Sequence, residues 1–142
     1  MYESDFPYVA NDYGACKYSS TRIAVKNTGF INIPRTEADH LKYLNIAPLS
    51  VCLNMSPITY YKSGVFTSTT CSSSVNHAVT MVGYGTSSDG KPYYLIKNSW
   101  GRSWGDNGYF RISRNYANGG LGVCGILSYS VQPKWLWIWS SL

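Results

Sequence analysis

The chain has 142 residues and a net charge of +5, with 44% apolar and only 13% charged residues. This size and composition fit one globular domain and exclude an intrinsically disordered chain. No apolar run approaches the roughly 18 residues that a membrane-spanning helix needs, so no membrane span is expected. The 12 basic residues are scattered singly along the chain. This scatter favours a solvated basic surface and argues against nucleic-acid binding.

Turn-forming residues dominate the first part of the chain, so residues 1–33 are expected to be irregular. Thr36, with Asp39 three residues later, forms a capping-box pattern that predicts the start of a helix. Apolar residues then recur at a spacing of three, which indicates one face of a short helix that ends before Pro48. His40 is expected at a solvated polar position on that helix.

After the helix, the pattern of apolar residues changes to short runs and alternation, which is typical of strands. A turn is expected at 87–90, where Ser-Ser-Asp-Gly interrupts the apolar runs. The expected fold is therefore α+β and predominantly β: one short helix and a small, mostly antiparallel barrel or curled sheet. The expected strands lie at 49–53, 78–84, 93–96, 109–113 and in part of 126–131.

The two ends of the chain carry less information. The N-terminus has no basic segment followed by an apolar one, so no signal peptide is expected in this chain. The extension at 134–142 is rich in tryptophan, which alternates with leucine and isoleucine. An edge strand or an unpacked extension is favoured over a membrane-surface anchor, because the apolar residues lack helical spacing and an opposing basic face.

Four cysteines with long spacings contain no C-x-x-C pair, which argues against a zinc ribbon. We expect neither a metal nor another cofactor. The even number of cysteines leaves disulfides possible, and composition alone does not decide the redox compartment.

His77 follows the polar loop 71–76 at the start of an expected strand. A histidine at such a junction can be held rigidly while its ring reaches a cleft, although a structural role is equally compatible. The segment 97–109 places two tryptophans and three glycines around Asn98. A buried amide there can accept a hydrogen bond from a neighbouring imidazole and fix its tautomer, while the indoles exclude water.

These segments resemble the histidine and asparagine signatures of papain-like cysteine peptidases, especially the cathepsin L type. The resemblance extends over about residues 4–133 in the family's order. It implies the barrel-like half of a two-domain fold, the C-terminal half only. The segments that carry it are Asn-His-Ala-Val at 76–79, Val-Gly-Tyr-Gly at 82–85, Tyr-Leu-Ile-Lys-Asn-Ser-Trp-Gly at 94–101 and Trp-Gly at 104–105.

The resemblance also implies roles for individual residues. His77 would be the general base and acid, Asn98 would orient its ring, and Trp100 and Trp104 would shield the active site on the primed side. Tyr129 would form the floor of the pocket for the residue before the scissile one. The implied substrate-cleft residues are Cys52, Val75, Asn76, Ala78 and Tyr129.

In this family the nucleophilic cysteine lies some 130–150 residues before the histidine, whereas only 76 residues precede His77. The nucleophile is therefore expected to be absent, and the chain alone is predicted to be inactive. We expect a fragment of a papain-like peptidase. In it, residues 1–33 would wrap onto the missing helical half, 34–133 would form the barrel half and 134–142 would be an extension. The alternatives are a non-catalytic papain-like binding protein or one half of a split enzyme.

Further implications of the resemblance concern the cysteines and the partners. Cys71 and Cys124 match a pair that the family bridges by a disulfide, and Cys16 matches a position whose partner lies in the missing half. The implied partners are peptide or protein substrates, the missing N-terminal half and a protein inhibitor. The implied location is lysosomal or secreted.

Overall fold

The computed structural model describes residues 2, 4–9, 14–23, 25–114 and 119–136. The chain divides into two compact units, one comprising the described residues of 1–30 and 133–142 and the other Ile31–Gln132. The boundaries fall within the first and the last strand. Every residue for which the sequence suggests a catalytic or cleft role lies in the second unit.

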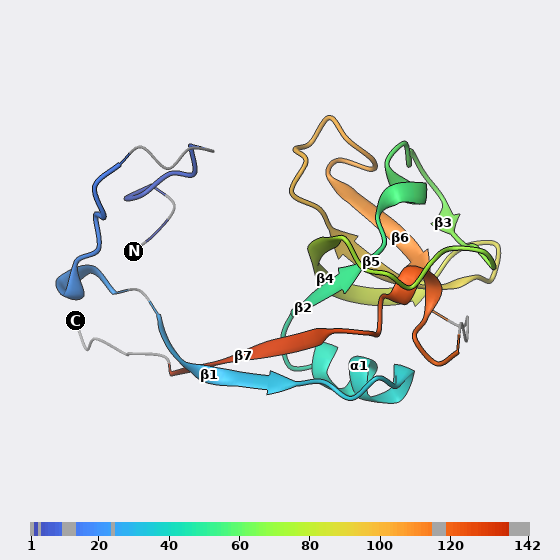
Figure 1. Ribbon diagram of the computed structural model, residues 1–142, viewed down its shortest axis with the longest axis horizontal. Coiled ribbons are helices and arrows are strands. Elements are labelled where there is room, and N and C mark those ends of the chain that lie inside the picture. The colour runs from blue at the N-terminus through green and yellow to red at the C-terminus, as the bar shows by residue number, and fades with distance from the viewer. Residues whose placement is uncertain (1, 3, 10–13, 24, 115–118, 137–142) are drawn as a thin grey trace. The chain divides into compact units, whose positions relative to one another are not determined.

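One helix and seven strands make up the regular structure of the described residues, together with three short 3-10 turns (Figure 1). The elements in chain order are η1 (Ser20–Arg22), β1 (Lys26–Asn32), α1 (Glu37–Leu44), β2 (Leu49–Leu53), η2 (Ser56–Ile58), β3 (Val65–Phe66), β4 (His77–Thr86), β5 (Pro92–Lys97), β6 (Tyr109–Ser113), η3 (Val123–Gly125) and β7 (Ser130–Leu136).

The strands form a single sheet in the order β1-β7-β2-β4-β5-β6-β3. The pairs β2–β4, β2–β7, β4–β5 and β5–β6 are antiparallel, while β3 runs parallel to β6. The expected fold class is confirmed: the described chain is mostly β, with one short helix and a largely antiparallel sheet. The parallel strand at the edge was not expected, because two residues are too few to show a pattern.

The helix begins where the capping pattern places it. The Thr36 hydroxyl oxygen accepts a hydrogen bond from the backbone N–H of Asp39 at 3.1 Å, which satisfies one of the free donors of the first turn. Helix α1 ends at Leu44, before Pro48. The helix prediction is therefore confirmed.

His40, by contrast, is completely buried, so the expectation of a solvated position was wrong. Its Nδ1–H donates to the carbonyl oxygen of Thr36 at 2.8 Å, and its Nε2 lies 2.7 Å from the hydroxyl of Ser130. This serine lies 90 positions away in β7, beyond the reach of any local pattern. Burial lowers the pKa of His40 below its ordinary value, and the Thr36 carbonyl and Asp39 carboxylate oppose this effect only partly.

Each of the five predicted strands overlaps a strand of the structure, and strands β1 and β3 were not predicted. Strands β2 and β6 have the expected bounds, and β4 and β5 are slightly longer than expected. Only the last residues of 126–131 belong to β7, because a tight turn precedes them in which Cys124 has a φ of 55°. Strand β1 lies in the segment that was expected to be irregular. Its residues are mostly exposed, so no apolar alternation marks it.

The core lies against one face of the sheet. In β2, Leu49, Val51 and Leu53 are fully buried, whereas Ser50 is exposed and Cys52 is half-buried. The second face of β2 is therefore available for other contacts. The remaining core residues include Ile58, Met81, Tyr94, Ile96, Phe110, Ile112, Val123 and Ile126.

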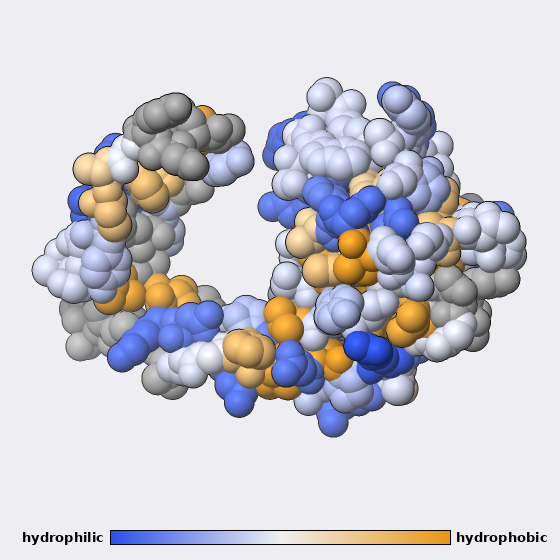
Figure 2. Space-filling view, viewed as in Figure 1, coloured by the Kyte–Doolittle hydropathy of each residue, from blue (hydrophilic) through white to orange (hydrophobic). Residues whose placement is uncertain are grey.

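The other unit exposes much of its apolar surface. Phe6, Val9 and Phe30 are each more than half exposed, and Figure 2 shows hydrophobic surface, in orange, on this part of the chain. Strand β7 enters the tryptophan-rich extension as far as Leu136, and the last two tryptophans, Trp137 and Trp139, lie outside the described residues. No helix among the described residues is long and apolar enough to cross a membrane.

Candidate active site

His77 and Asn98 meet at one end of a strand pair. His77 is the first residue of β4, and Asn98 directly follows the last residue of β5. Because the two strands are antiparallel neighbours, the start of β4 and the end of β5 lie side by side at the same end of the strands. Nε2 of His77 lies 2.9 Å from Oδ1 of Asn98.

This contact defines the proton positions of the ring. An amide oxygen only accepts hydrogen bonds, so Nε2 of His77 carries the hydrogen, and Nδ1 of the neutral ring is left free to take up a proton. Oδ1 of Asn98 also accepts from the backbone N–H of Ser99 at 2.8 Å, and the Asn98 residue is only 8% exposed. The amide is therefore held in place while it orients the imidazole.

Two tryptophans line one side of this pair. The Trp100 ring centroid lies 5.1 Å from that of His77, and Trp104 packs edge-on against Trp100 at 5.1 Å. The indole N–H of Trp104 donates to the carbonyl oxygen of Thr59 at 2.7 Å. Trp100 is 39% exposed, so one part of its ring contacts the histidine and another part reaches the surface.

Glycine is required in the loop that carries the tryptophans. Gly105 has a φ of +60°, and a Cβ atom built there would lie 2.6 Å from the carbonyl oxygen of Tyr109. Any other residue would both strain the backbone and clash with it. This close turn explains the density of glycines that the sequence shows after Asn98.

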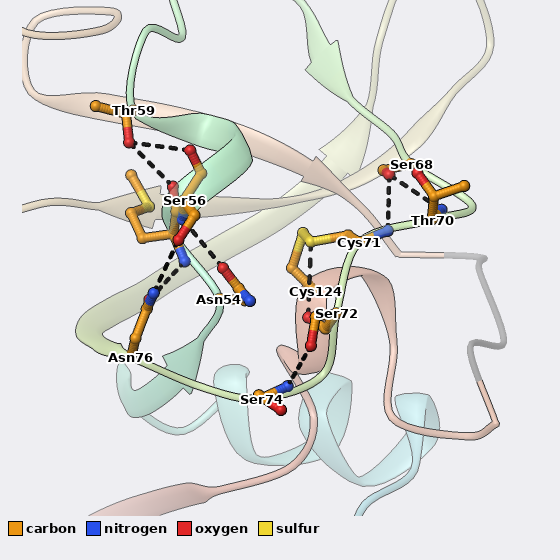
Figure 3. Close-up of a disulfide and its surroundings, with 11 residues drawn as sticks. Asn54, Ser56, Thr59, Ser68, Thr70, Cys71, Ser72, Ser74, Asn76 and Cys124 are labelled. Carbon is orange, nitrogen blue, oxygen red and sulfur yellow. Dashed lines mark hydrogen bonds between the residues drawn. A yellow bond between two sulfur atoms is a disulfide. The ribbon is translucent and has the colours of Figure 1, made fainter.

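Asn76, next to the histidine, forms three hydrogen bonds with the last residue of β2 and the segment that follows it. Its backbone N–H donates to the Leu53 carbonyl at 3.0 Å, its Oδ1 accepts from the Met55 N–H at 2.9 Å, and its Nδ2 donates to the Ser56 hydroxyl at 3.0 Å. Figure 3 shows the Asn76 amide directed at Ser56. Both functional atoms of this amide thus make contacts within the chain.

A disulfide joins Cys71 to Cys124, with an S–S distance of 2.11 Å (Figure 3). It connects the loop that leads to His77 with the turn that precedes Tyr129. Val75 is half-buried in the same loop. Cys16 and Cys52 are free thiols.

Three of the implied cleft residues form a row across neighbouring strands. Cys52 is paired with Ala78 in β4, and its backbone N–H donates to the Tyr129 carbonyl at 3.0 Å on its other side. Residues directly opposite in a sheet share a face, and this is the face turned away from the core. His77 pairs with Leu53 and so shares the opposite face, which separates the Cys52 thiol from the imidazole.

A pocket of about 440 Å³ lies beside Asn98, and five of its lining residues were given no role from the sequence. The alternation of side chains along the strands predicts that three of these residues lie on the sheet face turned away from the core, but no short sequence pattern indicates a pocket on that face. The Nδ2 atom of Asn98 is buried without a hydrogen-bond partner among the described residues. The five residues are Ser50, Val79, Thr80, Lys97 and Ser99. Within the described part of the chain, no group of three or more His, Cys, Asp and Glu side chains could hold a metal ion.

Comparisons with known proteins agree on one protein family. Residues 1–134 match the family described as papain family cysteine protease. The chain is 43% identical over 137 residues to a pro-cathepsin H of Medicago truncatula, covering 92% of this chain and 37% of that protein. It is 41% identical over 136 residues to cathepsin S of Mus musculus, covering 93% of this chain and 38% of that protein. The chain thus spans well under half the length of these relatives.

A solved structure supports the same relationship. The bromelain protease of Ananas comosus in complex with the E64 inhibitor superimposes with a TM-score of 0.86 at 37% identity, over 93% of this chain and 61% of that one. A recombinant stem bromelain precursor gives a TM-score of 0.84, also at 37% identity, over 93% of this chain and 43% of that one.

Proposed function

The chain belongs to the papain family of cysteine proteases, and we propose that it supplies His77 and Asn98 to a cysteine peptidase whose nucleophilic thiol lies outside these 142 residues. The observation that carries the proposal is the 2.9 Å contact between His77 Nε2 and Asn98 Oδ1. It leaves Nδ1 of the ring as the free base, which is what activation of a thiol requires.

The reaction would proceed through this nitrogen. Nδ1 of His77 takes the proton of the thiol, and the resulting thiolate attacks the carbonyl carbon of a peptide bond. His77 then gives the proton to the departing amine as the C–N bond breaks, which leaves a thioester. Water, deprotonated by the same nitrogen, hydrolyses the thioester and restores the thiol. Asn98 holds the ring in position throughout, and Trp100 shields the contact between them.

Three of the four cysteines within the chain are poor candidates for the nucleophile. Cys71 and Cys124 are joined in the disulfide. Cys52 lies on the sheet face opposite to that of His77, as its pairing with Ala78 requires. In this proposal the helical half of the enzyme contributes the thiol.

The same proposal explains why each of the two units has solvent-exposed surface that another part of the enzyme could bury. Residues 1–33, with exposed Phe6 and Phe30, would wrap onto the helical half, and 34–133 would form the barrel half. The pocket lined by Lys97 and Asn98 would lie where that half covers the sheet. The proposed cleft residues are Cys52, Val75, Asn76, Ala78 and Tyr129, with Trp100 and Trp104 on the primed side.

The substrates would be peptides or proteins, and a protein inhibitor would compete for the same cleft. A disulfide forms and persists in oxidising compartments, which supports a lysosomal or secreted location. Extension 134–142 has no role in the proposed reaction.

Mixing the chain with a separately prepared papain-type helical half that carries the segment Cys-Gly-Ser-Cys-Trp tests the proposal. Association is measured by light scattering, and activity by hydrolysis of a fluorogenic dipeptidyl amide. We expect activity only from the complex. His77→Ala should lower kcat by about 10²–10⁴-fold, the usual contribution of a general acid–base group. Lys91→Ala, at an exposed turn, is the control and should leave kcat unchanged.

Each contrary result has a definite meaning. A complex that forms without hydrolysing the reporter favours the non-catalytic binding protein. Failure of the two halves to associate contradicts the hypothesis that the chain is one half of a split enzyme. Activity that survives His77→Ala contradicts the assignment of the base.

A further inference from the structure

The turn between β2 and β3 is bonded to both motifs of the candidate site. Turn 55–59 contains η2, and the core anchors it, because Met55 is 3% exposed and Ile58 is completely buried. The proposed reaction gives this turn no role. Its hydrogen bonds nevertheless lead to His77 by two separate routes, one through the backbone and one through aromatic rings.

The first route runs through the residue before the histidine. Asn76 directly precedes His77, and both functional atoms of its amide are bonded to the turn. The Oδ1 atom accepts from the Met55 N–H at 2.9 Å, and the Nδ2 atom donates to the Ser56 hydroxyl at 3.0 Å. An amide bonded at both atoms has one orientation, so these bonds restrain the backbone where β4 begins. The turn therefore helps to fix where the backbone of His77 lies.

The second route runs through two indole rings. The carbonyl oxygen of Thr59 accepts from the indole N–H of Trp104 at 2.7 Å. Trp104 packs against Trp100, and Trp100 packs against the His77 ring, in each case with 5.1 Å between the ring centroids. An imidazole in contact with indoles that a hydrogen bond holds in place has fewer accessible rotamers. The same turn therefore restrains the ring of His77 as well as its backbone.

The hydroxyl of Thr59 joins the two routes. It donates to the carbonyl oxygens of Ser56 and Met55, at 3.1 and 3.4 Å. A threonine hydroxyl that bonds back to the preceding backbone closes a short turn locally. This closure fixes the Thr59 carbonyl that binds Trp104. In Figure 3, dashed lines run from Ser56 both to Thr59 and to Asn76, so one residue of the turn receives a bond from each route.

We propose that Ser56 and Thr59 are positioning residues for His77. They hold the imidazole where its Nε2 meets the Asn98 oxygen and its Nδ1 stays free to take up a proton. They act through the asparagine before His77 and through the two indoles, not on the reacting atoms. The inference rests on the proposed function, because the orientation of His77 affects the reaction rate only if His77 is the acid–base group.

The first test measures the tautomer of His77 in the full chain, labelled with ¹⁵N in histidine, at pH 8. The double variant Ser56→Ala/Thr59→Val removes both hydroxyls, and valine keeps the shape of threonine. The ¹⁵N shifts of the His77 ring should move from the form with hydrogen on Nε2 toward a mixture of the two neutral tautomers. His40 is the internal reference, since it carries its hydrogen on Nδ1, and its shifts should not change.

The second test measures kcat and KM after assembly with the helical half. The double variant should lower kcat by about 10–100-fold, the effect of a small misplacement of a catalytic group, and leave KM unchanged. Thr59→Val alone should also lower kcat. Thr59→Ser keeps the hydroxyl that closes the turn and should retain the native kcat.

Thr36→Val is the matched control. It makes the same exchange of threonine for valine and removes a hydroxyl that accepts from the Asp39 N–H at 3.1 Å, at the start of α1. It should lower the stability of the chain but change neither the tautomer of His77 nor kcat. Equal effects of Thr36→Val and Thr59→Val on kcat would overturn the inference, because the cause would then be a general loss of stability.

The two tests distinguish this inference from the function on which it rests. An unchanged tautomer of His77 in the double variant, or an unchanged kcat in an active assembly, overturns the inference and leaves the peptidase assignment intact. An altered tautomer in an assembly that cleaves no reporter supports the positioning of His77 by the turn and contradicts the peptidase assignment.

Discussion

Ser130 and His40 form a buried hydrogen bond that joins strand β7 to helix α1, with 2.7 Å between the serine Oγ and the histidine Nε2. Because Nδ1 donates to the Thr36 carbonyl, Nε2 of the neutral ring is an acceptor, and the serine hydroxyl donates to it. The fold thus contains two histidines with opposite environments. His77 lies at the end of a strand and has one ring nitrogen without a hydrogen bond to the described chain, whereas both ring nitrogens of the buried His40 form hydrogen bonds.

The stability of the protein should decrease as the pH falls below about 6.5. Burial lowers the pKa of His40 in the folded chain, so the unfolded chain binds more protons in this range and gains free energy relative to the fold. The contribution is fully present above the unfolded pKa and is lost progressively toward the folded pKa. Urea midpoints at pH 7.5, 6.5 and 5.5 in a His77→Ala background isolate His40. A midpoint that stays constant over this range contradicts the prediction.

Replacing both Cys71 and Cys124 by serine should lower the free energy of unfolding by about 4 kcal/mol. The two residues are 53 positions apart, and closing a loop of that length removes about this much conformational entropy from the unfolded chain. Chemical denaturation of the double variant measures the change. The matched control is Cys52→Ser, which leaves the bridge intact. Equal stability of the bridged and unbridged chains would show that the bond stabilises nothing.

Asn76→Ala should destabilise the chain by about 1–3 kcal/mol, because the N–H of Met55 loses its acceptor and the Ser56 hydroxyl loses a donor. Asn45→Ala is the comparison. The Asn45 amide accepts one bond, from the exposed hydroxyl of Tyr84, and its loss should change stability by less than about 0.5 kcal/mol. Thermal denaturation distinguishes the two. If both variants lose the same stability, the bonds of Asn76 are no more important than a surface contact.

Tyr94→Phe should leave the stability unchanged or raise it. The Tyr94 hydroxyl is buried without a hydrogen-bond partner among the described residues, so its removal relieves a desolvated polar group. Tyr61→Phe should lower the stability by about 1 kcal/mol, since the Tyr61 hydroxyl donates to the Gly64 carbonyl at 2.6 Å. Denaturant unfolding of the two variants compares them directly. A clear loss in Tyr94→Phe would mean that this hydroxyl has a partner after all.

Asn98→Ala should change the tautomer of His77. In the native chain the Asn98 oxygen selects the form with hydrogen on Nε2, and without it both neutral tautomers become accessible. The ¹⁵N shifts of the imidazole, recorded at pH 8, report the two forms. Asn45→Ala is again the control and should leave the spectrum unchanged. An imidazole spectrum that is identical in Asn98→Ala and the native chain would contradict the orienting role.

Part of the candidate site follows from short stretches of sequence. The motif around His77 lies at the start of one strand, and Asn98 follows the end of the next strand along the chain. Antiparallel pairing of these two strands brings the two residues together. What the motifs do not contain is the surroundings of the site. The three bonds of Asn76 run to a segment some 20 residues earlier, and the hollow beside Asn98 needs β2 as well as β4 and β5.

Local patterns of residues predict the helix start at Thr36, most of the strands and the two residues of the proposed dyad, because caps, alternation and motifs act over a few residues. The burial of His40 against Ser130 and the position of Arg35 over Tyr129 depend instead on how the chain packs. In both cases the partner comes from a segment at least 90 residues away. Such neighbours depend on the order of strands in the sheet, and no local pattern of side chains encodes that order.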